Sequence, residues 1–175
     1  MSVEVTEQEF WRGRLVQAHV SGRGLHTAVF DVEPEEWLRI QDETAGLILR
    51  YVRIGDRILD VGCGYGAVRD CLPAERDIGY AGIDLSPDLI EIARLRHPDD
   101  PFVVGDARAL PFGEDSFTAV VARSVRTMLV EHDRKDVWDD ILDECLRVSP
   151  IVLVLEYGRH VGRPEPCFVV EVLRR

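Results

Sequence analysis

The stretch ILDVGCGYGAVRD, residues 58–70, sets the fold because three glycines follow directly on a short apolar run. The run contains the carboxylate of Asp60, and the glycines are Gly62, Gly64 and Gly66. Glycine permits positive φ and lets backbone N–H groups come close to a ligand. The spacing therefore predicts a turn at the end of a buried strand that a ligand approaches closely. On its own the motif is weak, so the ligand has to be inferred from the rest of the chain.

From Arg57 onward, short aliphatic runs alternate with segments of helical periodicity. Nearly continuous aliphatic runs are typical of parallel strands covered on both faces. The pattern predicts an α/β fold with a doubly wound, Rossmann-like, mainly parallel sheet, in which ligands bind beyond the carboxyl ends of the strands. Ser86 as a cap and Pro87 at the first position mark a helix at 86–97. A helix from Gly66 to Pro73, another at 133–148, and strands at 57–61, 80–85, 101–106, 116–122, 151–157 and 167–175 complete the expectation.

Two helices precede this alternating core. One is expected at 6–19, where Thr6 and Glu9 have capping-box spacing, and the other begins at Pro34. Residues 20–31 show little periodicity and are expected to form a loop. A chain of 175 residues suits one domain. We expect a single domain over 1–175, with an N-terminal helical cap at 1–53, a cofactor-binding core at 57–157 and a short extension at 158–175.

The composition indicates a globular protein and disfavours nucleic acid as a partner, although an acidic protein can still carry a local basic patch. The formal net charge is 21 − 32 = −11, whereas a surface that follows phosphates carries a basic excess. The N-terminus lacks the pattern of a secretory signal, and no run reaches the roughly 18–20 apolar residues that span a bilayer. The four cysteines form no CxxC pair and have no nearby histidine at metal-ligand spacing. We therefore expect a cytoplasmic protein with reduced thiols, no metal and no membrane partner.

Two further carboxylates make the glycine motif more specific. Asp84 ends the second strand in GIDLS, where a carboxylate can accept both hydroxyls of a ribose. Asp106 ends the third strand in VVGDARALPF, where it can accept from an exocyclic amine such as that of adenine. Together with Asp60, these strand-end residues predict an adenosine-shaped site with negative potential.

Three stretches, LDVGCGYG, GIDLSPDLIEIAR and VVGDARALPFGEDSFTAVVA, closely resemble the motifs of class I S-adenosylmethionine-dependent methyltransferases, in particular small single-domain members of type 11. The resemblance runs from about Arg57 to Tyr157, with the motifs in order. It implies S-adenosyl-L-methionine as cofactor and methyl transfer to a small-molecule acceptor by in-line displacement. A sulfonium is primed to lose methyl, so such an enzyme needs an acceptor held at near-attack distance in a dry pocket.

The resemblance also assigns a part of the cofactor to each motif. The glycine loop would lie beside the methionine part, with Asp60 supporting the loop and partly contacting the amino group. The remaining assignments are Asp84 to the ribose, Leu85 to the flank of the adenine, Asp106 and Ala107 to the adenine edge, and Arg123, mostly through its backbone, to the neighbourhood of the methyl group.

The sequence offers several candidates for the acceptor side. Arg123 and Arg126 could bind an acidic acceptor, although solvated or ion-paired arginines are an equal alternative. His132, between Glu131 and Asp133, could act as a general base, and the alternative is a surface cluster at a helix start. Further candidates for the pocket are His26 and Phe30 in the loop before the second helix, whereas Trp11 and Trp37 are expected as core anchors.

Two features depart from the family pattern. The turn before the fifth strand reads LRVSP and lacks the usual glycines, and after Tyr157 only residues 158–175 remain, where the family adds two antiparallel strands and a helix. We therefore expect a shortened C-terminal strand region. Its sheet edge could be completed by a second copy of the chain, which would give a homodimer.

Two other functions stay open on the sequence alone. Gly62, Gly64 and Ala67 also fit the GxGxxG/A pattern of dinucleotide-binding folds, so an NAD-dependent oxidoreductase is one alternative. Against it, the chain offers no second domain and no tyrosine–lysine pair for hydride chemistry. The other is a non-catalytic regulatory module that binds S-adenosylmethionine without turnover, which would suit the shortened C-terminal region.

Overall fold

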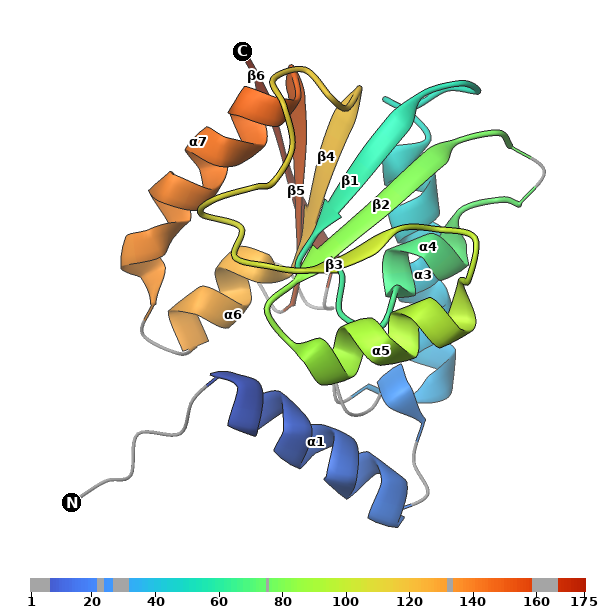
Figure 1. The fold of residues 1–175 in the computed structure, drawn as a ribbon. Coiled ribbons are helices and arrows are strands. Elements are labelled where there is room, and N and C mark those ends of the chain that lie inside the picture. Colours follow the sequence, from blue (N-terminus) through green and yellow to red (C-terminus); the bar gives the residue numbers. More distant parts are fainter. Residues whose placement is uncertain (1–6, 22–23, 27–31, 75, 132–133, 159–166) are drawn as a thin grey trace.

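The computed structural model of the chain describes residues 7–21, 24–26, 32–74, 76–131, 134–158 and 167–175 (Figure 1). Its helices are α1 (Glu7–Ser21), α3 (Pro34–Ile48), α4 (Ala67–Cys71), α5 (Pro87–Arg96), α6 (Val125–Glu131) and α7 (Trp138–Val148), with a short 3₁₀ helix at Lys135–Val137. Its strands are β1 (Arg57–Val61), β2 (Gly79–Asp84), β3 (Phe102–Val104), β4 (Ala119–Arg123), β5 (Ile151–Gly158) and β6 (Cys167–Arg174).

One six-stranded sheet, in the order β3-β2-β1-β4-β5-β6, forms the centre of the fold. Neighbouring strands are parallel except for β5 and β6, which are antiparallel. The strand order reverses between β1 and β4, which pair with Val61 opposite Ala122. Open α/β sheets bind ligands at such a switch point, beyond the carboxyl ends of the strands. The doubly wound, mainly parallel sheet predicted from the sequence is confirmed.

Helices cover both faces of the sheet, with α3, α4 and α5 on one side and α6 and α7 on the other (Figure 1). Successive side chains of a strand point to opposite faces of the sheet, so each strand contributes side chains to two hydrophobic cores. Ile58 and Val121 lie in the core beneath α3, whereas Leu59 and Val120 lie in the core beneath α7. All four side chains are fully buried. The packed sheet therefore holds the loops at its strand ends in place.

Local sequence signals explain the positions of α5 and α7. Ser86 caps α5, since its Oγ accepts a hydrogen bond from the Leu89 N–H at 3.3 Å, and Pro87 occupies the first turn. The apolar stripe of α7 repeats at helical spacing and faces the sheet. The prediction of α5 is confirmed, whereas the helix expected over 133–148 comprises Trp138–Val148 and follows the 3₁₀ helix at Lys135–Val137. The buried members of the α7 stripe are Ile141, Cys145 and Val148.

Further elements differ from the sequence-based expectation, and one of them is the fourth strand, which was expected over 116–122 and comprises Ala119–Arg123. The third strand was expected over 101–106 but comprises Phe102–Val104, since its pairing with β2 runs from Gly82 to Asp84, where β2 ends. Helix α6 was not predicted. Its first N–H groups, those of Arg126 and Thr127, donate to the Glu156 carboxylate on β5, each at 3.1 Å. The cap of α6 therefore comes from a residue about 30 positions away, which local sequence cannot reveal.

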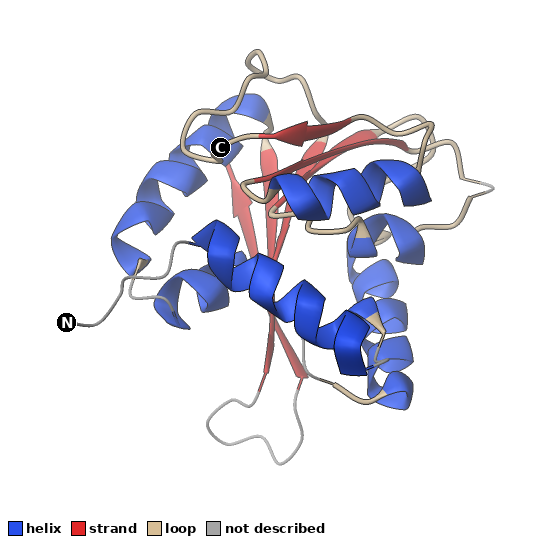
Figure 2. Cartoon of the chain, turned by 60° about the horizontal axis from the view of Figure 1, so that its bottom comes forward, coloured by secondary structure: helices blue, strands red, loops and turns tan. Residues whose placement is uncertain are grey.

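Helix α1 lies across the carboxyl ends of the strands (Figure 2). Trp11 and Leu15 pack against a small cluster that contains Tyr65 and Leu89. Arg12 forms an ion pair with Asp88 of α5 at 3.2 Å. The N-terminal helix is thus placed next to the loop that carries the glycines.

Candidate functional site

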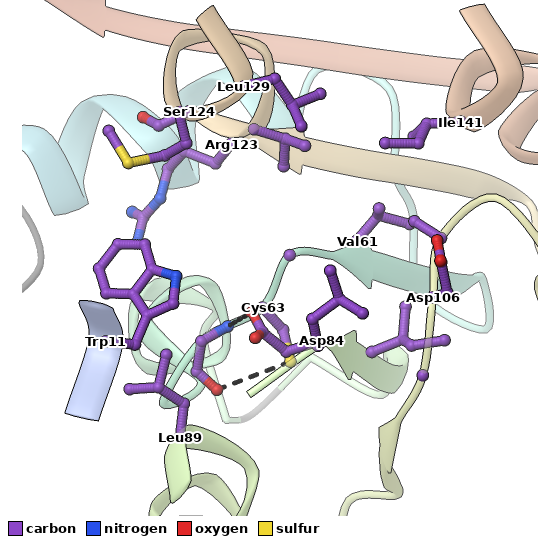
Figure 3. A pocket seen from close by; sticks show the side chains of 18 of the residues that line it. Trp11, Val61, Cys63, Asp84, Leu89, Asp106, Arg123, Ser124, Leu129 and Ile141 are labelled. Atoms are coloured by element: carbon purple, nitrogen blue, oxygen red, sulfur yellow. Dashed lines mark hydrogen bonds between the residues drawn. The ribbon is translucent and has the colours of Figure 1, made fainter. Parts of the chain in front are cut away.

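A cavity of about 470 Å³ lies at the switch point of the sheet. Its floor is the glycine loop after β1, and its walls come from the segments that follow β2, β3 and β4. Helices α6 and α7 contribute apolar side chains to one side, and Trp11 of α1 lies on another (Figure 3). This is the edge of the sheet at which the sequence predicted a site.

The glycine loop adopts conformations that favour glycine. Gly62 and Gly66 have φ of 69° and 85°. A Cβ on Gly62 would lie 2.7 Å from Val125 Cγ2, and one on Gly66 would lie 2.8 Å from His97 Cδ2. The N–H of Gly62 also donates to the carbonyl of Ile83 at 2.9 Å, which ties the loop to β2. Gly62 lines the cavity, whereas Gly66 does not and precedes α4.

Asp84 lies in the cavity wall, and two backbone N–H groups orient its carboxylate. Gly64 N–H donates to Oδ2 at 2.8 Å (Figure 3). Ser86 N–H donates to Oδ1, also at 2.8 Å. Leu85 follows with a side chain that is 41% exposed and also lines the cavity. The structure therefore brings the glycine loop, Asp84 and Leu85 together, as their order along the chain predicted.

Asp106 and Ala107 also line the cavity, in the segment after β3. Arg108, which was not predicted as a site residue, forms an ion pair with Asp106 at 2.5 Å. The hydrogen bond from this guanidinium lowers the pKa of Asp106. The Arg108 side chain also lines the cavity, so an ion pair stands where the sequence predicted a lone carboxylate.

Asp60 is fully buried and does not line the cavity. The Tyr80 O–H donates to its Oδ2 at 2.6 Å, while its Oδ1 has no hydrogen-bond partner within the described residues. Burial raises the pKa of Asp60 to about 7, against the effects of the Tyr80 hydrogen bond and the Arg123 charge. Its carboxyl group therefore lies beneath the loop, inside the protein.

The two arginines proposed for the acceptor side lie in different places. Arg123 ends β4, is 7% exposed and lines the cavity. Its Nη1 donates to Gln41 Oε1 at 2.7 Å and to Thr44 Oγ1 at 3.3 Å. Arg126 does not line the cavity and forms an ion pair with Glu171 at 2.8 Å.

The aromatic residues and histidines considered for the pocket also lie in different places. Trp11 lines the cavity, although the sequence favoured a core role for it. Trp37 packs against the cluster that contains Tyr65 and Leu89. The His26 ring stacks on the Trp37 ring with a centroid distance of 5.8 Å. Phe30, His132 and Asp133 lie outside the described residues, as does the side chain of Glu131.

Sequence reasoning missed the apolar wall of the cavity. It is formed by Met128 and Leu129 of α6 together with Ile141 of α7. These residues are far from the glycine motif in the sequence, and they meet it only because α6 and α7 cover the same face of the sheet. The helical periodicity of α7 was the one sequence signal for this wall. It indicated that Ile141 is buried, but not that it faces a cavity.

Three negative findings apply to the described residues. They contain no cluster of histidine, cysteine, aspartate and glutamate suited to a metal ion. None of their helices has the length and apolar character needed to cross a membrane. The three cysteines whose side chains are described, Cys63, Cys71 and Cys145, are free thiols.

Comparison with known proteins identifies the same part of the chain. Residues 59–149, just over half of the chain, match the family model described as a methyltransferase domain. The chain is 32% identical over 88 residues to the demethylmenaquinone methyltransferase of Renibacterium salmoninarum, covering 50% of this chain and 35% of that protein. It is 34% identical over 111 residues to the 27-O-demethylrifamycin SV methyltransferase of Amycolatopsis mediterranei, covering 58% of this chain and 40% of that protein. The matches thus span less than half the length of either relative.

A solved structure shares the fold over nearly the whole chain. The TehB-like S-adenosylmethionine-dependent methyltransferase of Corynebacterium glutamicum superposes with a TM-score of 0.60. The alignment covers 96% of this chain and 98% of that one at 19% identity. At this level of identity, the similarity concerns the fold alone.

Proposed function

We propose that this chain, which belongs to the methyltransferase domain family, binds S-adenosylmethionine at the strand ends and transfers its methyl group to a small-molecule acceptor. The observation that carries the proposal is the hydrogen bond from the Gly64 N–H to Asp84. It joins the glycine loop to a ribose-type carboxylate at the switch point, within the segment that the family model matches.

The residues around the cavity fit this cofactor. Gly62 lines the cavity with a φ of 69°, a conformation that favours glycine, and Asp84 presents a half-buried carboxylate to donors such as ribose hydroxyls. Asp60 supplies a buried carboxyl with an unpaired oxygen within the described residues, beneath the loop that would face the methionine part. We assign the ribose to Asp84, the methionine part to Gly62 and Gly64 with Asp60 in support, and the adenine to Leu85, Asp106 and Ala107.

Bound S-adenosylmethionine supplies a methyl group on a positively charged sulfur. The chain's own task is then to position the acceptor and exclude water, which can lower a barrier by roughly 7–11 kcal/mol. Trp11, Met128 and Leu129 give the cavity an apolar boundary suited to both tasks. A hydroxyl or amine acceptor would also need a base, for which His132 remains a sequence-based candidate.

The acceptor is proposed to be a small molecule. The net charge of −11 disfavours a polyanion such as nucleic acid as acceptor. The relatives named above carry demethylmenaquinone and 27-O-demethylrifamycin SV in their names, both small molecules. A cytoplasmic location, a single domain over 1–175 and a homodimer are further parts of the proposal.

The proposal is tested with S-adenosylmethionine labelled in its methyl group and separated cell fractions. We expect label to enter a small-molecule fraction, and we expect Asp84→Ala to abolish this transfer. Binding of the cofactor with no transfer into any fraction would favour the non-catalytic module. Absence of cofactor binding would overturn the proposal.

A further inference from the structure

The guanidinium of Arg123 lies in the cavity wall beside the glycine loop. β1 and β4 pair in register with Val61 opposite Ala122, so the next residues, Gly62 and Arg123, leave the sheet side by side. Both line the cavity. The side chain is 7% exposed, so its charge is held within the protein rather than in bulk solvent.

Helix α3 holds this guanidinium from one face. Arg123 Nη1 donates to Gln41 and Thr44, and its Cζ lies 5.5 Å from the centre of the Trp37 ring. These three residues share a face of α3, at spacings of four and three. Gln41 is itself fixed, because its Nε2 donates to the Ala67 carbonyl at 2.7 Å. The guanidinium is therefore oriented before any ligand arrives.

The guanidinium suits a carboxylate ligand, because it presents five N–H donors in a planar fork that matches a carboxylate. Asp60 lies beneath the same loop, is fully buried and does not line the cavity. This end of the cavity therefore offers the Arg123 guanidinium to the carboxylate of an α-amino acid.

We propose that Arg123, positioned by Gln41 and Thr44, binds the carboxylate of the amino-acid end of the cofactor. This inference rests on the proposed function. It gives the Arg123 side chain a binding role, whereas the family resemblance implied a role mostly through the backbone of this residue. In this interpretation, the contacts of α3 with Arg123 of β4 and with Ala67 of α4 serve to orient a ligand-binding side chain. Recognition of an acceptor's carboxylate by Arg123 is the competing outcome.

The test compares two ligands by calorimetry. S-adenosylhomocysteine has the amino-acid end, and 5′-methylthioadenosine lacks it. We expect Arg123→Gln to weaken binding of S-adenosylhomocysteine by about 10- to 100-fold, the loss typical of a hydrogen bond to a charged group, while binding of 5′-methylthioadenosine changes little. Arg123→Lys should show an intermediate loss, since lysine keeps the charge but not the fork. Arg50→Gln, at an exposed arginine outside the cavity, is the matched control.

The outcomes separate this proposal from the proposed function. If the wild type binds neither ligand, the proposed function fails. If Arg123→Gln weakens the binding of both ligands equally, Arg123 has a structural role. If the affinity for S-adenosylhomocysteine is unchanged, the target of Arg123 is an acceptor. Either result overturns the inference. If Arg123→Gln does not fold, Gln41→Met and Thr44→Val test the same point, with a smaller loss expected for S-adenosylhomocysteine alone.

Discussion

The N–H of Gly64 donates to Asp84 Oδ2 at 2.8 Å, which joins the loop after β1 to the end of β2. The second oxygen of the same carboxylate accepts from Ser86, the cap of α5. One side chain therefore orients the glycine loop and remains in the cavity wall. Loss of this carboxylate should affect the ligand and the loop together.

We expect Asp84→Ala to weaken binding of S-adenosylhomocysteine at least about 10-fold, because hydrogen bonds to a charged group contribute roughly 1.5–3 kcal/mol. Titration calorimetry measures the change. The matched control is Asp99→Ala, at an exposed carboxylate outside the cavity, which should bind like the wild type. Unchanged affinity in Asp84→Ala would show that the ribose has been assigned to the wrong residue.

Replacing Gly62 by alanine should destabilise the protein. Its φ is 69°, where an L-residue costs about 1–2 kcal/mol, and the new Cβ would lie 2.7 Å from Val125 Cγ2. Gly46→Ala is the contrasting variant, because Gly46 lies within α3 with no atom within 4 Å of the added Cβ. That change should stabilise the fold by roughly 0.5–1 kcal/mol. Urea unfolding compares the two, and a stabilised Gly62→Ala would contradict the loop geometry.

Asp60 should make stability depend on pH in an unusual direction for a carboxylate. Burial raises its pKa to about 7, whereas an unfolded aspartate has a pKa of about 4. Between these values the unfolded chain has lost the proton that the folded protein retains. This residue therefore makes the free energy of unfolding fall as pH rises from about 4 to 7, and adds a constant penalty above that range.

Asp60→Asn removes this titration and keeps an acceptor for the Tyr80 hydroxyl. Above pH 7 the variant should be more stable than the wild type by about 2–4 kcal/mol, given 1.36 kcal/mol per pKa unit. The difference should shrink on acidification and vanish below about pH 4. Urea unfolding across this range measures it. A wild type more stable than the variant at pH 8 would refute a neutral, buried carboxyl.

Glu156 should contribute more to stability than the neighbouring Glu171. Glu156 is 4% exposed and accepts from the N–H groups of Arg126 and Thr127 at the start of α6. Glu156→Ala should leave these groups unsatisfied and cost about 1–3 kcal/mol. Glu171→Ala removes only the partner of Arg126 from a side chain that is 42% exposed, so its cost should stay under about 1 kcal/mol. Equal losses in urea unfolding would argue against Glu156 as the cap of α6.

The sequence predicted those elements whose signals are local. The aliphatic run into β1, the Ser86–Pro87 start of α5 and the apolar stripe of α7 each follow from neighbouring residues. The cavity position of Asp84 followed in turn from the rule that parallel strands end at one edge.

Features that depend on distant contacts were not predictable in the same way. Helix α6 is capped by Glu156 from another strand, and the Arg123 side chain is oriented by α3, about 80 residues earlier. Arg108 follows Asp106 in the sequence, but its pairing with that carboxylate depends on the loop conformation after β3. For Glu156 and Arg123 tertiary packing places the side chain, whereas the Arg108 pair is a local contact within the loop after β3.

Calorimetric titration of the wild-type chain with S-adenosylhomocysteine and, separately, with NADH is the sharpest test of the cofactor assignment. We predict saturable binding of one S-adenosylhomocysteine per chain and no measurable binding of NADH. Binding of NADH in its place, or no heat with S-adenosylhomocysteine, would contradict it.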